Sequence, residues 1–163
     1  SHIILPGVGS FGSSMKKINK TLPIQLLEKE VLSKNKPFLG ICVGMQVLAN
    51  NGLEFGDYKG LGWIEGTVDQ LNSKKNPLPH IGWNEINIKN NSKIVDGLEE
   101  VRDFYFVNSF VFKPKNKTNI VAETIYGESF ASIIMKKNII GVQFHPEKSQ
   151  KAGQKLISNF LKY

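Results

Sequence analysis

The sequence predicts an α/β domain, because its first part alternates short apolar runs with helical patterns. The runs HIIL at 2–5 and PFLGI at 37–41 are typical of parallel strands that are buried on both faces. Between them, MKKINK and IQLLEKEVL have helical spacing, and Pro23 separates them into two helices. This order of strand, helix and strand is typical of an α/β sheet.

The rest of the chain is dominated by β-branched and aromatic residues between turns rich in Gly, Asn, Lys and Pro. Six runs of this kind are predicted as strands: TVDQL, NEINIK, DFYFVNSFVF, NIVAETIY, SFASIIMKK and NIIGVQFH. The closing segment QKAGQKLISNFLKY has helical spacing and is predicted as a helix. No repeat, low-complexity tract or linker divides the sequence, so we expect one domain over residues 1–163.

Composition narrows the class of protein. Apolar residues make up 40% of the chain, and no run approaches the ~18 to 20 residues of a membrane span. There is no secretory signal pattern, and a single cysteine cannot form an internal disulfide, so we expect a cytoplasmic protein. The chain opens at SHIILPG without an initiator methionine and runs directly into a strand. We therefore expect an N-terminally truncated domain.

The net charge of +7 raises the question of a nucleic-acid partner. The lysines, however, are scattered in pairs such as Lys74-Lys75 and Lys136-Lys137. Nothing in the sequence resembles a recognition helix or an aromatic stacking motif. The charge pattern favours a solvated surface, with an acidic partner or a phosphorylated ligand as a further reading.

The segment GICVGMQ at 40–46 contains the only cysteine, Cys42, between an apolar run and the helical-looking stretch VGMQVLANN. A strand that passes through a glycine-flanked residue into a helix is typical of a nucleophile elbow. The start of that helix is expected to lower the thiol pKa and to favour the thiolate. On these residues alone, a buried structural cysteine remains an equal alternative.

A nucleophilic thiol needs a base within reach and a third group that orients the base. Among the three histidines, His2 lies at the start of the chain and His80 lies in the prolyl turn LPHIGW. His145 lies in QFHPE, where strand alternation would point His145 and Glu147 to the same side. The sequence therefore predicts a triad of Cys42, His145 and Glu147.

GICVGMQ followed by a late FHPE resembles the class I, or triad, glutamine amidotransferases. Within that family, the chain is similar to the glutaminase subunits of imidazole glycerol phosphate synthase, an enzyme of histidine biosynthesis. The resemblance covers essentially the whole chain, through the segments PGVGSFG, KGLGWIEGTV, LPHIGWNEI, FYFVNSF and GVQFHPEKSQKAG. It implies a flavodoxin-like three-layer fold with a mixed central sheet. Family members begin some tens of residues earlier, which agrees with a missing N-terminal part.

The resemblance implies a glutaminase reaction that needs no metal and no cofactor. Cys42 attacks the side-chain amide of glutamine, His145 protonates the departing ammonia, and water hydrolyses the thioester. The oxyanion of this reaction requires backbone donors, and the N–H of Val43 directly follows the nucleophile. The family adds a glycine-rich stretch as the other oxyanion segment: Gly7, Val8 and Gly9. It also implies four glutamine-binding residues: Gln46, Glu54, Ser109 and Phe110.

The resemblance further implies a heterodimer with a (β/α)8-barrel synthase subunit that receives the ammonia. Trp83 and Asn84 match residues at the contact between the two subunits, and Lys148 matches a residue near the mouth of the ammonia tunnel. On sequence alone, the alternative for Trp83 is a buried position in the core. The chain departs from the family pattern of His-Ser/Thr-Tyr, because it has Asn108 and Phe110 around Ser109. This departure bears on coupling to the partner and leaves the triad unchanged.

Two alternatives of function stay open at this stage. A paralogous glutaminase–barrel pair supplies ammonia for sugar amidation in surface-polysaccharide synthesis, and the Asn108 departure suits such a pair. The second alternative is a regulatory or binding module on the same fold with a silent triad. The presence of Cys42, His145 and Glu147 argues against silence.

Overall fold

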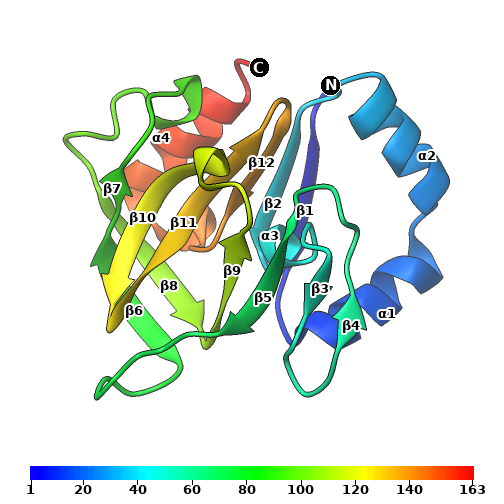
Figure 1. The fold of residues 1–163 in the computed structure, drawn as a ribbon. Coiled ribbons are helices and arrows are strands. Elements are labelled where there is room, and N and C mark those ends of the chain that lie inside the picture. The colour runs from blue at the N-terminus through cyan, green and yellow to red at the C-terminus, as the bar shows by residue number, and fades with distance from the viewer.

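The computed structural model describes residues 1–163, and Figure 1 shows its ribbon. A six-stranded sheet lies at its centre, in the order β1-β2-β12-β11-β10-β7. Its strands are β1 (Ile3–Gly7), β2 (Phe38–Cys42), β7 (Asn87–Ile88), β10 (Ile120–Tyr126), β11 (Glu128–Lys136) and β12 (Ile139–Val142). Strands β1, β2 and β12 run parallel, whereas the pairs from β12 to β7 are antiparallel, so the sheet is mixed as predicted.

Two smaller sheets complete the β-structure. One has the order β4-β3-β5-β9, and the other pairs β6 with β8. Their strands are β3 (Asn51–Gly52), β4 (Tyr58–Lys59), β5 (Gly66–Gln70), β6 (His80–Glu85), β8 (Asp103–Asn108) and β9 (Phe110–Pro114). The predicted run DFYFVNSFVF therefore splits at Ser109, whose carbonyl accepts from Leu71 N at 2.9 Å. The split sends its two halves to different sheets and turns the chain at the candidate site.

The helices follow the predicted order, with Pro23 between the first two. Figure 1 shows α1 and α2 beside the β1 edge of the central sheet, and α4 on the side of β10, β11 and β12. The α-helices are α1 (Phe11–Thr21), α2 (Ile24–Glu28), α3 (Val43–Gln46) and α4 (Gln150–Phe160). The other helical turns are the π-helix η1 (Lys29–Ser33) and the 3-10 turns η2 (Lys93–Val95), η3 (Lys117–Asn119) and η4 (Pro146–Lys148).

Helix α3 is shorter than the nine-residue stretch VGMQVLANN that the sequence predicts as helical. It ends at Gln46 because the following carbonyls bond to a distant segment. The carbonyl of Val47 accepts from Leu61 N, and that of Asn50 accepts from Gly60 N, both at 2.8 Å. These contacts take the carbonyl groups that a longer helix would use, and they lead the chain into β3 instead.

One cluster of 39 buried apolar residues, from Phe11 to Phe160, forms the core. All five residues of β2 are buried, so the strand that carries Cys42 is fixed on both faces. No helix combines the length and the apolar character that crossing a bilayer requires.

Candidate active site

Cys42 lies at a sharp turn between β2 and α3, with φ 55° and ψ −115°. This backbone conformation is strained for a residue with a side chain and is typical of a nucleophile elbow. The flanking glycines are needed for close approach. A Cβ on Gly40 would lie 2.3 Å from the carbonyl oxygen of Gly44, and a Cβ on Gly44 would lie 1.9 Å from that of Leu5. The elbow predicted from GICVG is present in the structure.

The thiol of Cys42 is 5% exposed, and burial raises its pKa to about 11. The N–H of Val43 lowers this pKa, whereas the charges of Glu147 and Glu54 raise it further. The contribution of the helix start therefore has the predicted sign, but the expected net lowering of the pKa was wrong, because desolvation of the thiolate outweighs the backbone contribution. The resting thiol is therefore protonated at neutral pH, and it donates to Val107 O at 3.9 Å.

His145 Nδ1 lies 2.8 Å from Glu147 Oε1, and the imidazole side chain is buried while the carboxylate is exposed. The sequence placed both residues on one strand, but β12 ends at Val142 and Glu147 lies in the turn η4. The turn brings the two side chains together, rather than strand alternation. Backbone contacts hold His145 in place, since its N–H donates to Tyr105 O at 2.9 Å and its carbonyl accepts from Ser149 Oγ at 2.7 Å.

A cavity of about 220 Å³ opens beside Cys42 and His145. It gathers most residues that the sequence assigned to the site: Val8, Gly9, Cys42, Val43, Gln46, Glu54, Ser109, Phe110 and His145. Gly7 does not line this cavity but lies at the end of β1, directly opposite Cys42 in the strand register. Pro79, Val107 and Asn108 also line the cavity.

The polar side chains of this cavity are held by specific contacts. Gln46 Nε2 donates to Phe110 O at 2.9 Å and to Gln143 Oε1 at 3.1 Å. Both amide hydrogens of Gln46 are thereby used, so only its Oε1 remains to meet a ligand. Glu54 Oε2 accepts from Phe11 N at 2.7 Å, which ties this carboxylate to the start of α1.

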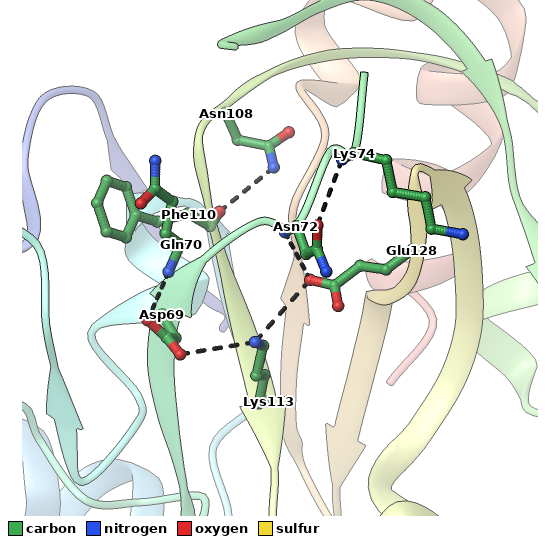
Figure 2. A network of polar contacts seen from close by, with 8 residues as sticks. All are labelled: Asp69, Gln70, Asn72, Lys74, Asn108, Phe110, Lys113 and Glu128. Carbon is green, nitrogen blue, oxygen red and sulfur yellow. Dashed lines mark hydrogen bonds and ion pairs between the residues drawn. The ribbon is translucent and has the colours of Figure 1, made fainter. Parts of the chain in front are cut away.

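Figure 2 shows the polar contacts that surround two residues of the cavity, Asn108 at the end of β8 and Phe110 at the start of β9. Asn108 Nδ2 donates to Phe110 O at 3.3 Å, while the buried Oδ1 of Asn108 has no hydrogen-bond partner. Farther along β9, Lys113 Nζ lies 3.6 Å from Asp69 Oδ2 and 3.9 Å from Glu128 Oε1. These charges link β5, β9 and β11.

Two of the three residues assigned to a partner contact, Trp83 and Lys148, lie against Tyr105, which the sequence analysis did not single out. The Trp83 ring lies 5.9 Å from the Tyr105 ring, and Lys148 Nζ lies 5.8 Å from its centroid. Asn84 Nδ2 donates to Ile125 O at 3.0 Å. Trp83 is 47% exposed, so it is not the core residue that was its alternative. Alternation along β8 puts Tyr105 on the half-buried side of that strand, and this was the available signal.

A second residue that the sequence analysis did not assign is Gln143. It is fully buried, and its Nε2 lies 3.8 Å from Cys42 Sγ. It belongs to the quoted motif QFHPE, two positions before His145. That position was the only sequence signal, because the contact depends on packing β12 beside β2.

The family profile described as "Glutamine amidotransferase class-I" matches residues 1–163. This chain belongs to the class-I glutamine amidotransferases. Imidazole glycerol phosphate synthase subunit HisH of Pelagibacter ubique is 46% identical over 162 residues, 98% of this chain and 78% of that protein. Subunit HisH 2 of Methanococcus maripaludis is 46% identical over 163 residues, covering 99% and 80%. The HisH of Aquifex aeolicus is 43% identical over 162 residues, covering 97% and 75%.

Solved structures of other amidotransferases share the fold. PurLQS from Thermotoga maritima superposes with a TM-score of 0.71 at 20% identity, over 99% of this chain and 79% of that chain. A crystal structure titled as a glutamine amidotransferase gives a TM-score of 0.70 at 18% identity, over 98% and 76%. At such identities the likeness speaks for the fold alone. The predicted class I amidotransferase fold with a mixed sheet is confirmed.

Proposed function

We propose that this amidotransferase is the glutaminase subunit of an imidazole glycerol phosphate synthase in histidine biosynthesis. It hydrolyses L-glutamine to glutamate and passes the ammonia to a (β/α)8-barrel synthase subunit. Relatives that share 43 to 46% identity over nearly the whole chain carry that enzyme's name. The activity itself rests on one observation: Cys42 in its elbow and His145, bonded to Glu147, line the same cavity.

In the proposed mechanism, Cys42, His145 and Glu147 act as a triad. The Sγ–H proton of Cys42 moves to His145, and the sulfur attacks the side-chain amide carbon of glutamine. The C–N bond then breaks, and His145 returns its proton to the leaving nitrogen, which departs as ammonia. Water, deprotonated by His145, hydrolyses the thioester to glutamate and restores the thiol. Glu147 accepts from Nδ1, which leaves Nε2 as the basic nitrogen of His145.

The oxyanion of each tetrahedral intermediate needs preorganised donors. We assign the N–H of Val43 and peptide groups of the segment from Gly7 through Val8 to Gly9 to this task. The position of Val43 supports the assignment, because its N–H already lowers the pKa of the Cys42 thiol and therefore faces the reacting sulfur.

The α-amino group of glutamine is a cation, and the cavity offers acceptors for it. We assign Gln46 Oε1 and the free carboxylate oxygen of Glu54 to this ammonium, since their other polar atoms are engaged within the protein. Ser109 and Phe110 line the same cavity and are assigned to the carboxylate and the aliphatic part of the substrate.

The resting geometry fits a subunit that is idle until its partner docks. The thiol proton faces Val107 O, and the pKa of Cys42 near 11 keeps the nucleophile protonated at neutral pH. Trp83, Asn84 and Lys148 are proposed as the docking surface of the barrel subunit. The names of the relatives favour the histidine pathway over sugar amidation, and Asn108 is the feature that suits the sugar-amidation alternative.

Replacing the nucleophile tests this function directly. We expect Cys42→Ala to abolish glutamine hydrolysis in the complex while the protein stays folded, and an electrophilic glutamine analogue to label Cys42 alone in the wild-type chain. Mass spectrometry of the labelled peptide and an assay of released glutamate provide the two readouts. If glutamine hydrolysis by the complex survives Cys42→Ala, the chain is not a triad amidotransferase.

A further inference from the structure

We propose that Gln143 is a further catalytic residue, whose side-chain N–H donates to Cys42 Sγ and stabilises the thiolate as it forms. This inference rests on the proposed function, because it assigns the sulfur as the reacting atom. Gln143 Nε2 lies 3.8 Å from Sγ, within the range of a hydrogen bond to sulfur. The residue is fully buried in the segment that follows β12, so its side chain is held by packing.

A chain of hydrogen bonds fixes the direction in which this amide points. The carbonyl of Phe110 can only accept, so the group of Gln46 that it meets at 2.9 Å is the NH₂. The same Nε2 meets Gln143 at 3.1 Å, which requires Gln143 to present its oxygen there. The NH₂ of Gln143 is then left for the sulfur. A reversed amide would set two NH₂ groups against each other.

The buried sulfur has few other groups that favour a negative charge: the N–H of Val43 and the charge of Lys148 lower its pKa, whereas the charges of Glu147 and Glu54 raise it. In the resting state Sγ donates to Val107 O, and a carbonyl oxygen repels the sulfur once the proton has moved to His145. The N–H of Val43 favours the thiolate, but the proposed mechanism requires that donor for the substrate oxyanion. Gln143 is therefore the donor that stays with the sulfur when glutamine is bound.

The single cysteine of the chain makes this inference measurable without an activity assay. The rate of alkylation of Cys42 in the full-length subunit, followed by mass spectrometry across a pH series, has a midpoint at the pKa of the thiol. A change in access alters only the plateau of that curve. We expect Gln143→Met, which removes the donor without adding charge, to raise the midpoint by about one pH unit, as loss of a charge-assisted hydrogen bond would.

The same variant has a kinetic signature in the complex. We expect kcat for glutamine hydrolysis to fall by about tenfold with KM little changed, because the sulfur is stabilised in the transition state and Gln143 does not line the substrate cavity. Ser132→Ala is the matched control. The backbone carbonyl of Ser132 accepts from Gln143 N at 2.9 Å, and the buried Oγ of Ser132 has no partner. Ser132→Ala therefore changes the packing next to Gln143 without removing a contact to the sulfur.

Gln46→Met provides a second route if Gln143→Met does not fold. This substitution removes the hydrogen bond that fixes the orientation of the Gln143 amide. We expect it to raise the midpoint by less than Gln143→Met does, because Gln143 itself is intact. Unchanged midpoints in both folded variants would overturn the role of Gln143. That result would leave the proposed function standing wherever Cys42→Ala still abolishes hydrolysis, so the two failures are distinguishable.

Discussion

His145 and Glu147, whose Nδ1 and Oε1 atoms are in contact, have different roles in the proposed mechanism. In the proposed mechanism both proton transfers pass through the imidazole, so we expect His145→Ala to lower glutamine turnover by about 10³-fold or more. Glu147 orients the ring without carrying protons and is exposed to water, so Glu147→Gln should cost about a hundredfold less than His145→Ala. The measurement is glutamate release by the complex with acceptor present. Near wild-type turnover in His145→Ala would contradict the role of His145 as the base.

At the same scale, the sequence predicted which residue types carry the chemistry but not their electrostatics. The motifs GICVG and QFHPE predict Cys42, His145 and Glu147 as nucleophile, base and orienting group, because a thiol nucleophile needs a base and the base needs an orienting group. The pKa of the thiol depends on what buries it. Val107 on β8 and Gln143 after β12 reach the sulfur only through the fold, so local sequence could not reveal the desolvation that raises this pKa.

At the scale of elements, the elbow depends on the backbone contact between Gly44 and β1. We expect Gly44→Ala to destabilise the protein by about 3 kcal/mol or more, because the added Cβ would lie 1.9 Å from the backbone oxygen of Leu5. Gly12→Ala is the matched control, since its added Cβ meets only the side chain of Tyr58, at 2.7 Å. Urea unfolding of both variants measures the difference, and equal losses would contradict a special requirement at the elbow.

The loop 71–79, which leads into β6, is attached to the turn before β11. Asn72 N donates to Glu128 Oε1 at 2.9 Å, as Figure 2 shows, and Tyr126 Oη donates to Pro77 O at 2.8 Å. We expect Glu128→Ala to speed tryptic cleavage at Lys74 in this loop, because local opening becomes cheaper. Glu128→Gln keeps an acceptor for the N–H of Asn72, so we expect cleavage at Lys74 to be slower in this variant than in Glu128→Ala. Unchanged cleavage in Glu128→Ala would show that the turn does not hold the loop.

Elements were predictable where their signal is local and wrong where a distant segment decides. The strands β1 and β2 and the break at Pro23 follow from apolar runs and from proline geometry. The end of α3 at Gln46 follows instead from carbonyl groups that bond to residues 60–64, and the break at Ser109 follows from pairing with two different sheets. Such competition is absent from the local pattern that predicts a helix or a strand.

At the scale of the whole molecule, Trp83 on β6, the half-buried Tyr105 on β8 and Lys148 in the turn η4 form one group near His145. A subunit docked on this group would contact the elements that hold the imidazole. The idle resting site implies that docking with acceptor bound raises glutamine hydrolysis by roughly 10²-fold or more. That factor corresponds to ~3 kcal/mol of transition-state stabilisation, which one backbone N–H directed at the oxyanion can supply.

The glycine-rich segment at the end of β1 is the part most able to supply that donor, because Gly9 already has φ 104° and glycine peptides reorient at low steric cost.

We expect Trp83→Ala to weaken association with the barrel subunit or to lower the activation, while alkylation of Cys42 stays unchanged. Leu161→Ala removes an apolar side chain of similar exposure from the segment after α4 and should change neither. Glutamate release by the full-length subunit alone, then with the barrel subunit, then with acceptor, separates these steps. Full activity of the isolated subunit, unaffected by a barrel partner, would instead describe a self-sufficient amidohydrolase whose oxyanion donors are already in place.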